Sequence, residues 1–192
     1  MLHDPWLDRW LALAVQHAGG EPALEIGCGH GADTAVLARA GLRVVAFDLS
    51  RAAVMLAKAR VPSASIECRD IRSPFPEAAR GTGLVVASLS LHYFPWAETV
   101  EIVDRIRDVM RPGGLLLCRL NSTQDHHFGA VGHREIEPNF YDVAGEPKRF
   151  FDGASVEALF AEGWTQVARE HILTRKYAKV KALWEVVLEK AG

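Results

Sequence analysis

Cysteine is scarce in this chain of 192 residues, which holds three: Cys28, Cys68 and Cys118. An odd number of thiols cannot all pair into disulfides, and their wide separations match no zinc-ligand spacing. The sequence therefore predicts neither a disulfide-stabilised fold nor a cysteine-ligated zinc site. It favours a reducing compartment, and we expect a cytoplasmic protein.

An excess of charge of one sign is also missing, because 22 Lys and Arg residues face 24 Asp and Glu residues for a net charge of −2. Such a balance gives no global attraction to nucleic acid or to an anionic membrane. Long apolar runs are absent as well. The longest uncharged run, residues 81–97, contains serines, a histidine and a proline, and residues 1–10 lack a basic start and an apolar signal core. We expect no membrane span and no nucleic-acid partner.

The composition that is present is that of a globular protein, with 49% hydrophobic and 24% charged residues. The length allows one substantial hydrophobic core and leaves no room for a second large domain. We therefore expect a single domain over residues 1–192.

Short apolar segments alternate with helical patterns along the first 120 residues. The predicted strands are residues 23–26, 43–47, 64–68, 84–87 and 115–120. Helical patterns separate them, for example from the capping Ser50 to Arg60. Strands that alternate with helices at this spacing favour a parallel sheet covered on both faces.

The C-terminal third departs from this alternation. Residues 165–171 and 183–188 are predicted strands with nothing helical between them, so we expect an antiparallel hairpin at the end of the sheet. The polar stretch 121–151 is longer than a connector needs to be, which suggests a functional loop or lid. The predicted fold class is α/β, a doubly wound, mostly parallel seven-stranded sheet with a C-terminal antiparallel hairpin.

A glycine-rich loop follows the first predicted strand, at the sheet edge where ligands bind in open parallel sheets. Gly27 and Gly29 let the backbone approach a ligand closely, and the following helix offers unpaired amides. Asp48 ends the second strand, where a carboxylate can accept both ribose hydroxyls. Together with Ala32 the glycines also fit a dinucleotide pattern, which leaves a nicotinamide or flavin cofactor as an alternative.

Glu25 favours a different ligand, because a carboxylate just before the first glycine would repel a diphosphate and suit a cationic ammonium or sulfonium group. Residues 24–31, Leu-Glu-Ile-Gly-Cys-Gly-His-Gly, resemble the first motif of class I methyltransferases that use S-adenosylmethionine. The resemblance continues in order through residues 47–50, 69–71, 87–93 and 111–114. It implies a Rossmann-like methyltransferase fold with S-adenosylmethionine as cofactor.

Residue roles follow from this resemblance for the methionyl and ribose parts of the cofactor. It implies that Gly27 and Gly29 contact the methionyl part and that Glu25 orients it. Asp48 would hold the ribose, with Leu49 beside it in the same motif.

The resemblance also implies roles for the next two motifs. Asp70 and Ile71 would border the adenine, as an acceptor for its amino group and an apolar wall. Ser88 and Leu89 would border the methyl donor.

The acceptor side is expected after the fourth strand. Methyl transfer is an in-line displacement that needs alignment and excluded water more than it needs a base. His92 and Tyr93 are the candidate catalytic residues, since they could hydrogen-bond or deprotonate an acceptor, with packing or capping as the alternative reading. The stretch 121–151 is the expected acceptor-side loop or lid.

Two further clusters are assigned no ligand. The loop residues Asp125, His126, His127 and His133 lack helical ligand spacing, so no metal is expected. A run of basic residues lies between the two predicted C-terminal strands and is interpreted as a solvated turn of the terminal hairpin. It comprises Arg175, Lys176, Lys179 and Lys181.

The sequence thus predicts a methyltransferase that passes a methyl group from S-adenosylmethionine to an unidentified small-molecule acceptor. A catalytically silent S-adenosylmethionine-binding module is the alternative, and a nicotinamide-dependent oxidoreductase is a third reading. Neither the attacking atom of the acceptor nor the oligomeric state follows from the sequence.

Overall fold

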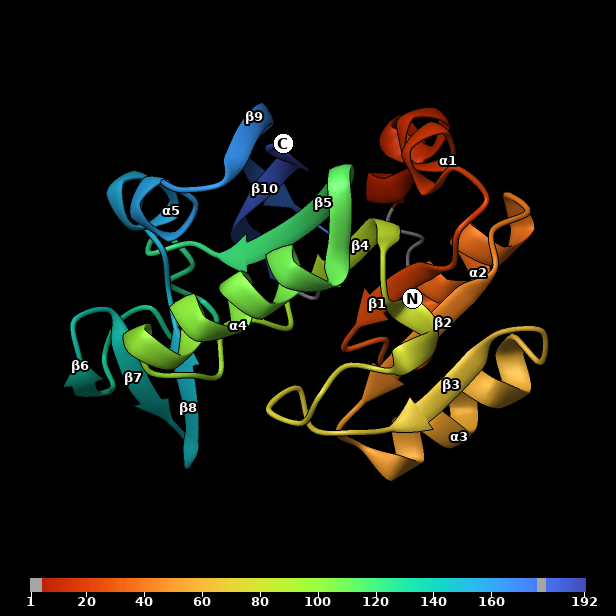
Figure 1. Ribbon diagram of the computed structural model, residues 1–192. Coiled ribbons are helices and arrows are strands. Elements are labelled where there is room, and N and C mark those ends of the chain that lie inside the picture. The colour runs from red at the N-terminus through yellow and green to blue at the C-terminus, as the bar shows by residue number, and fades with distance from the viewer. Residues whose placement is uncertain (1–4, 176–178) are drawn as a thin grey trace.

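The computed structural model describes residues 5–175 and 179–192 of the chain. Its main feature is a seven-stranded sheet in the order β3-β2-β1-β4-β5-β10-β9 (Figure 1). The parallel strands are β1 (Ala23–Ile26), β2 (Val44–Asp48), β3 (Ser65–Cys68), β4 (Thr82–Ser88) and β5 (Met110–Asn121). The helices are η1 (Pro5–Trp10), α1 (Leu11–Ala18), α2 (Ala32–Arg39), α3 (Arg51–Arg60), η2 (Glu77–Ala79), α4 (Trp96–Val109) and α5 (Gly153–Leu159).

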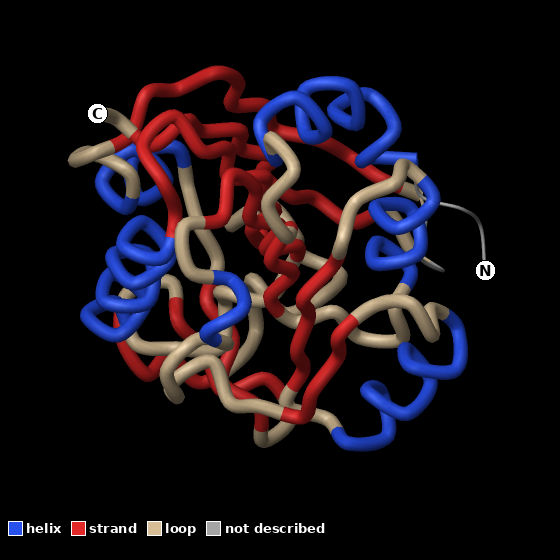
Figure 2. Tube along the Cα trace, turned by 45° about the vertical axis from the view of Figure 1, so that its right-hand side comes forward, coloured by secondary structure: helices blue, strands red, loops and turns tan. Residues whose placement is uncertain are grey.

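Helices cover both faces of the sheet (Figure 2), which explains why its central strands are buried along their length. One face packs on α4 and α5 through a core that includes Ile26, Ile106 and Leu116. The other face packs on α1, α2 and α3 through a core that includes Leu37 and Leu117. Alternate residues of one strand enter different cores because successive strand side chains point to opposite faces.

The C-terminal strands β9 (Trp164–Thr174) and β10 (Lys181–Lys190) form the antiparallel hairpin expected from the sequence. β10 pairs antiparallel with β5, so the hairpin completes the sheet at the β5 side. The predicted doubly wound, mostly parallel seven-stranded sheet with its terminal hairpin is confirmed. Both terminal strands are longer than predicted.

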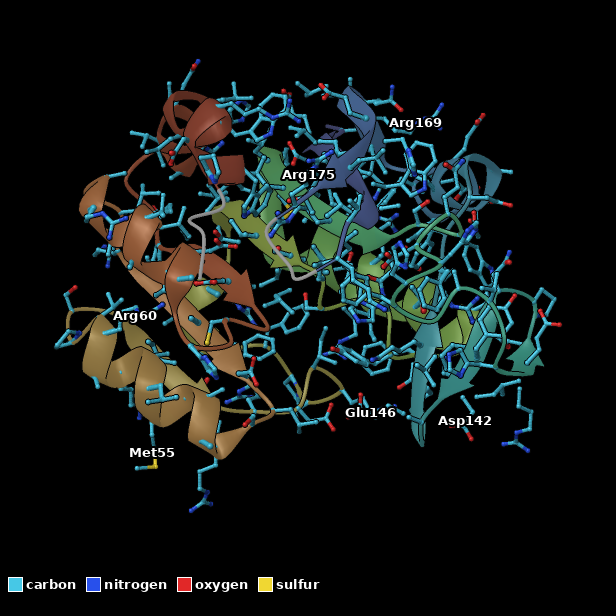
Figure 3. All side chains as sticks on the ribbon, turned by 180° about the vertical axis from the view of Figure 1, so that it is seen from behind. Met55, Arg60, Asp142, Glu146, Arg169 and Arg175 are labelled. Atoms are coloured by element: carbon cyan, nitrogen blue, oxygen red, sulfur yellow. The ribbon has the colours of Figure 1, made fainter. Side chains whose placement is uncertain are left out.

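The stretch 121–151 contains a second, smaller sheet. Its antiparallel strands are β6 (Arg134–Glu137), β7 (Phe140–Val143) and β8 (Glu146–Arg149). Figure 3 shows it, with Asp142 and Glu146 labelled, on the opposite side of the molecule from α3 with Met55 and Arg60. The backbone N–H of Arg149 donates to the carbonyl of His92 at 2.7 Å, which fastens β8 to the β4–α4 loop.

The main sheet changes direction between β1 and β4. From β1 the chain adds β2 and β3 on one side, and from β4 it adds β5 on the other. Connections that diverge in this way leave a crevice at the carboxyl ends of the two central strands. Within residues 5–175 and 179–192, no helix has the length and apolar character needed to cross a membrane.

Candidate functional site

The loop after β1 lies at this switch point and folds back on β2. The backbone N–H groups of Gly27 and Cys28 both donate to the carbonyl of Phe47, at 2.9 and 3.0 Å. A β-carbon at Gly27 would lie 2.6 Å from the β-carbon of Ser90, whereas one at Gly29 would meet nothing within 4 Å. A glycine is therefore required at position 27 because the loop after β4 passes so close to it. Gly29, in contrast, has open space beside its backbone.

Asp48 connects the glycine loop to the end of β2. Its Oδ2 accepts the backbone N–H of Gly29 and its Oδ1 accepts that of Ser50, both at 2.8 Å. Leu49, the next residue, has 70% of its surface exposed. The carboxylate and an exposed apolar side chain thus stand side by side at the rim of the crevice.

Glu25 lies in β1 just before the loop and is buried, with 3% of its surface exposed. Its Oε2 accepts a hydrogen bond from the Thr34 hydroxyl at 2.6 Å. Burial raises the pKa of Glu25 to about 8, with a smaller contribution from the negative charges of Asp33 and Asp48. The negative charges of Asp33 and Asp48 make this part of the crevice favourable for a cation, and a bound cation would in turn favour ionisation of Glu25.

The loop after β3 reaches the same edge. Ile71 is buried, and Asp70 accepts the backbone N–H of Arg72 through Oδ1 at 2.8 Å. The Arg105 guanidinium of α4 donates to the carbonyl of Ile71 at 3.0 Å, which holds the loop against α4.

At the end of β4, Leu89 adopts a positive φ of 56°, a conformation that non-glycine residues rarely adopt. Its backbone N–H donates to the carbonyl of Arg119 at 2.9 Å. The strained turn directs the chain from Ser88 across the front of Gly27. The structure brings the predicted site residues of all four motifs to one edge of the sheet.

Arg119 is a buried residue of this edge that the sequence analysis did not single out. Its Nε donates to the Ser88 hydroxyl at 2.9 Å, and its guanidinium lies 4.3 Å from the centre of the Trp6 ring. Trp6 in turn donates from Nε1 to Asp33 at 3.0 Å. The N-terminal segment therefore covers this part of the crevice. The position of Arg119 follows from the parallel pairing of β4 with β5, which places Arg119 beside Ser88. No sequence motif marks Arg119 as a residue of this edge.

His92 and Tyr93, the candidate catalytic residues, lie next to each other with ring centres 4.1 Å apart. Tyr93 is exposed, whereas His92 has 5% of its surface exposed, and its Nδ1 has no hydrogen-bond partner among the residues described. Burial lowers the pKa of His92 to about 3, helped by the positive charges of Lys181 and Lys148. The imidazole is therefore neutral near pH 7.

The loop cluster of acidic and imidazole side chains is dispersed. Asp125 is buried in an ion pair with Lys181, while His126, His127 and His133 are exposed. In the described part of the chain, no three potential ligands gather around a point that could hold a metal ion.

Lys181 corrects the interpretation of the basic run as a solvated turn, because its side chain is buried at the start of β10. Arg175 and Lys179 are exposed, and Lys176 lies outside the described residues.

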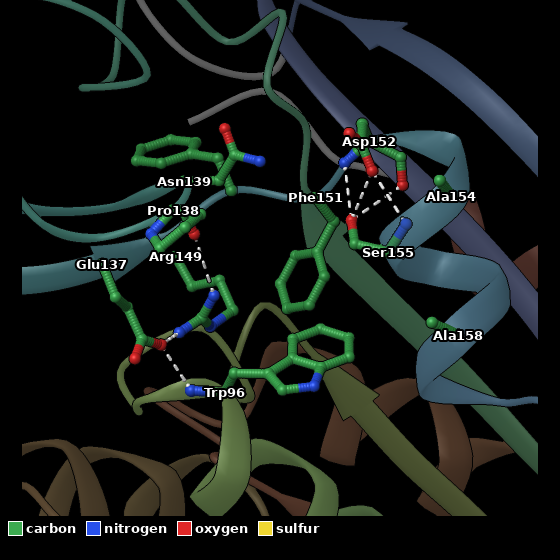
Figure 4. Close-up of a pocket in the computed structure, with 11 residues that line it drawn as sticks. Trp96, Glu137, Pro138, Asn139, Arg149, Phe151, Asp152, Ala154, Ser155 and Ala158 are labelled. Atoms are coloured by element: carbon green, nitrogen blue, oxygen red, sulfur yellow. Dashed lines mark hydrogen bonds and ion pairs between the residues drawn. The ribbon is translucent and has the colours of Figure 1, made fainter.

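A separate cavity of about 500 Å³ lies between α4, α5 and the small sheet (Figure 4). Glu137 is ion-paired with Arg149 there and accepts the backbone N–H of Trp96 at 2.6 Å. None of the predicted cofactor-binding residues lines it.

Comparisons with known proteins support one family. Residues 23–114 match a family model described as a methyltransferase domain. An uncharacterised methyltransferase of Synechocystis sp. is 32% identical over 50% of this chain and 45% of its own length. A trans-aconitate 2-methyltransferase of Deinococcus radiodurans is 29% identical over 54% of this chain and 39% of its own. The chain thus spans less than half the length of these curated relatives.

The fold as a whole matches that of solved structures. A structure of an S-adenosylmethionine-dependent methyltransferase from Clostridium acetobutylicum superposes with a TM-score of 0.74 at 14% identity, covering 100% of this chain and 93% of that one. At this level of identity the match concerns the fold alone.

Proposed function

This chain belongs to the class I S-adenosylmethionine-dependent methyltransferase family, and we propose that it transfers a methyl group to a small-molecule acceptor. The observation that carries the proposal is the carboxyl-lined glycine loop at the switch point, in which Asp48 accepts the N–H of Gly29. Open space beside Gly29, together with buried Glu25, fits a cationic ligand that carries a ribose.

S-adenosylmethionine, the methyl donor typical of this family, fits these residues. Glu25 would orient the methionyl ammonium beside Gly27 and Gly29. Asp48 would accept the ribose hydroxyls, and the exposed Leu49 would cover an adenine face.

Two further pairs of residues complete the proposed cofactor site. Asp70 and Ile71 would border the adenine on its other side. Ser88 and Leu89 would lie along the methyl donor, where the strained turn at Leu89 holds the chain close to Gly27.

When bound, the cofactor supplies a methyl group activated by a sulfonium. The protein has to align an acceptor with this methyl group and exclude water. His92 can take part as a neutral hydrogen-bonding group, because its lowered pKa of about 3 keeps it unprotonated. Tyr93, exposed beside it, would contact the acceptor from the outside.

A small-molecule acceptor agrees with the relative from Deinococcus radiodurans, whose name gives trans-aconitate as its substrate. We further propose that residues 121–151, with their small sheet, form the acceptor-side lid of this single domain. The cytoplasm stays the proposed compartment because all three cysteines are free thiols.

Isothermal titration with S-adenosylmethionine and S-adenosylhomocysteine tests the cofactor. We expect both to bind, and no binding to the folded protein at high micromolar ligand would overturn the proposal.

Methyl transfer from radiolabelled S-adenosylmethionine to a metabolite extract separates an enzyme from a silent binding module. The enzyme should label a product that is absent with the Asp48→Ala variant. Cofactor binding without any labelled small molecule would favour the silent module.

A further inference from the structure

Beyond the proposed cofactor residues, a row of polar side chains continues along the carboxyl ends of β4 and β5 and the start of the antiparallel β10. In β5, Leu115 and Leu117 belong to the core that packs on α1 and α2. Because strand side chains alternate, Arg119 and Asn121 point to this same face one and two steps further on. The row therefore lies next to Ser88, on the side of the crevice away from Asp48.

Two buried cations belong to this region. Arg119 has 3% and Lys181 7% of its surface exposed. Burial lowers the pKa of Lys181, and the positive charges of Lys148 and, to a smaller extent, Arg119 lower it further, while the bond to Asp125 acts in the opposite direction. Lys181 is held in place, since its Nζ donates to Asp125 at 2.7 Å and lies 4.8 Å from the Phe128 ring centre.

Neutral polar groups beside these cations lack partners. Within the described residues, Ser90 Oγ, His92 Nδ1 and Asn121 Oδ1 are buried and make no hydrogen bond. Asn121 has 2% of its surface exposed, so its amide is buried in the protein. Buried polar groups are normally satisfied, and a cluster of unsatisfied ones on two adjacent strand ends indicates a position for a polar ligand.

We propose that the acceptor carries an anionic oxygen group, a carboxylate or a phosphate, and binds with it at Arg119, Lys181 and Asn121. This anion ledge rests on the proposed function, because it names the acceptor for the same methyl donor. A guanidinium and an ammonium in a partly dehydrated site attract anionic oxygens strongly, and the Ser90 O–H and the Asn121 Nδ2–H can donate further hydrogen bonds to them. The unpartnered Asn121 Oδ1 is an acceptor, so it would take a hydrogen bond from a donor group elsewhere on the acceptor molecule. The remainder of the acceptor would then extend past His92 toward the small sheet.

His92, near the ledge, is neutral mainly because it is buried, since burial is the largest cause of its lowered pKa. A protonated imidazole would add a third positive charge beside Lys181 and Lys148, which the structure disfavours. A neutral imidazole can instead donate or accept a hydrogen bond beside the anion without competing for it.

The test is isothermal titration of succinate, inorganic phosphate and the neutral analogue succinamide into protein saturated with S-adenosylhomocysteine. Succinate or phosphate should bind, and succinamide should bind about tenfold more weakly, the scale of one charge-assisted hydrogen bond. Binding of succinate alone would identify the group as a carboxylate, and binding of phosphate alone as a phosphate. If neither anion binds more tightly than succinamide, the proposal is wrong.

Variants at two positions, Arg119 and Asn121, test whether the anion binds at the ledge. Arg119→Gln should lower the affinity for the anion about tenfold, and Arg119→Lys should retain part of this affinity. Asn121→Asp keeps the side-chain shape and adds a negative charge, so it should also lower the affinity for the anion. Arg43→Gln, at the opposite edge of the sheet, is the matched control and should change nothing.

The S-adenosylhomocysteine affinity of each variant separates the two proposals. Unchanged cofactor binding with anion binding lost in the Arg119 and Asn121 variants supports the ledge. Anion binding that is unchanged in both Arg119→Gln and Asn121→Asp overturns it, while the proposed function stands. Failure of wild-type protein to bind S-adenosylhomocysteine would instead overturn the proposed function.

Discussion

Lys181 Nζ and Asp125 Oδ2 lie 2.7 Å apart in a buried ion pair that joins β10 to the segment after β5. Asp125 also accepts the backbone N–H of Ala182 through Oδ1 at 3.2 Å. Both ions have lost most of their hydration, so each depends on the other. The pair fixes the start of the acceptor-side segment to the sheet.

Removal of one partner should therefore destabilise the protein strongly. We expect Asp125→Ala to lower the free energy of unfolding by about 3 to 5 kcal/mol, because Lys181 stays buried without its carboxylate. The double variant with Lys181→Met should lose less than Asp125→Ala alone. Urea unfolding measures both.

The surface pair of Glu157 and Arg169 provides the control for this prediction. Its atoms lie 3.5 Å apart and Glu157 is 76% exposed, so Glu157→Ala should cost under about 1 kcal/mol. Equal losses of unfolding free energy for Asp125→Ala and Glu157→Ala would show that the buried pair stabilises the protein no more than the exposed pair does.

Gly27→Ala should impair cofactor binding through a steric effect. The added β-carbon would lie 2.6 Å from Ser90 at a φ of 72°, so the loop after β4 must shift. Gly41→Ala is the matched control, since Gly41 has a φ of 85° and nothing within 4 Å. Both variants should lose about 1 to 2 kcal/mol of stability from backbone strain. Only Gly27→Ala should also lower the affinity for S-adenosylhomocysteine, by about tenfold or more. Equal affinities for the two variants in calorimetry would contradict a role for this close approach.

Asp48→Ala should weaken the binding of S-adenosylhomocysteine by about 1 to 3 kcal/mol, the scale of a lost charged hydrogen bond. The loss includes the ribose contact and the support that the carboxylate gives to the N–H of Gly29. Asp104→Ala on α4, which removes an exposed partner of Arg107, should leave the affinity unchanged. An unchanged dissociation constant for Asp48→Ala would rule out the ribose role.

Glu25 should make stability depend on pH. Its pKa rises from 4.5 in the unfolded chain to about 8 in the folded protein. Between these values the unfolded state ionises while the folded state keeps the proton, so stability is highest below the lower pKa and falls as pH rises toward 8. Relative to Glu25→Gln, the wild type should lose roughly 3 to 4 kcal/mol from about pH 5 to pH 8.

Urea midpoints of the two proteins across this pH range check the prediction for Glu25. Parallel pH profiles of wild type and Glu25→Gln would show that Glu25 ionises in the folded protein as it does in water.

The main sheet could be predicted because its signals are local. Apolar segments such as residues 23–26 and 84–87, separated by helical patterns, correspond to β1 and β4. The terminal hairpin followed from the absence of a helix between two strand patterns.

The small sheet could not be predicted in the same way. Its strands have four residues each, and β6 is exposed along most of its length, so no apolar alternation marks it. It forms because Phe140 and Phe150 pack beneath it and because Arg149 fastens it to the β4–α4 loop.

The order of strands and helices along the chain, and the motifs of the proposed cofactor site, follow from the sequence alone, because glycines and carboxylates at strand ends are local features. That Arg119, Asn121 and Lys181 share one face of the sheet beside Ser88 depends on how the strands pair. These residues come from β5 and β10, whose antiparallel pairing joins positions about 60 residues apart. A contact of that kind depends on register and burial, which no single stretch of the chain encodes.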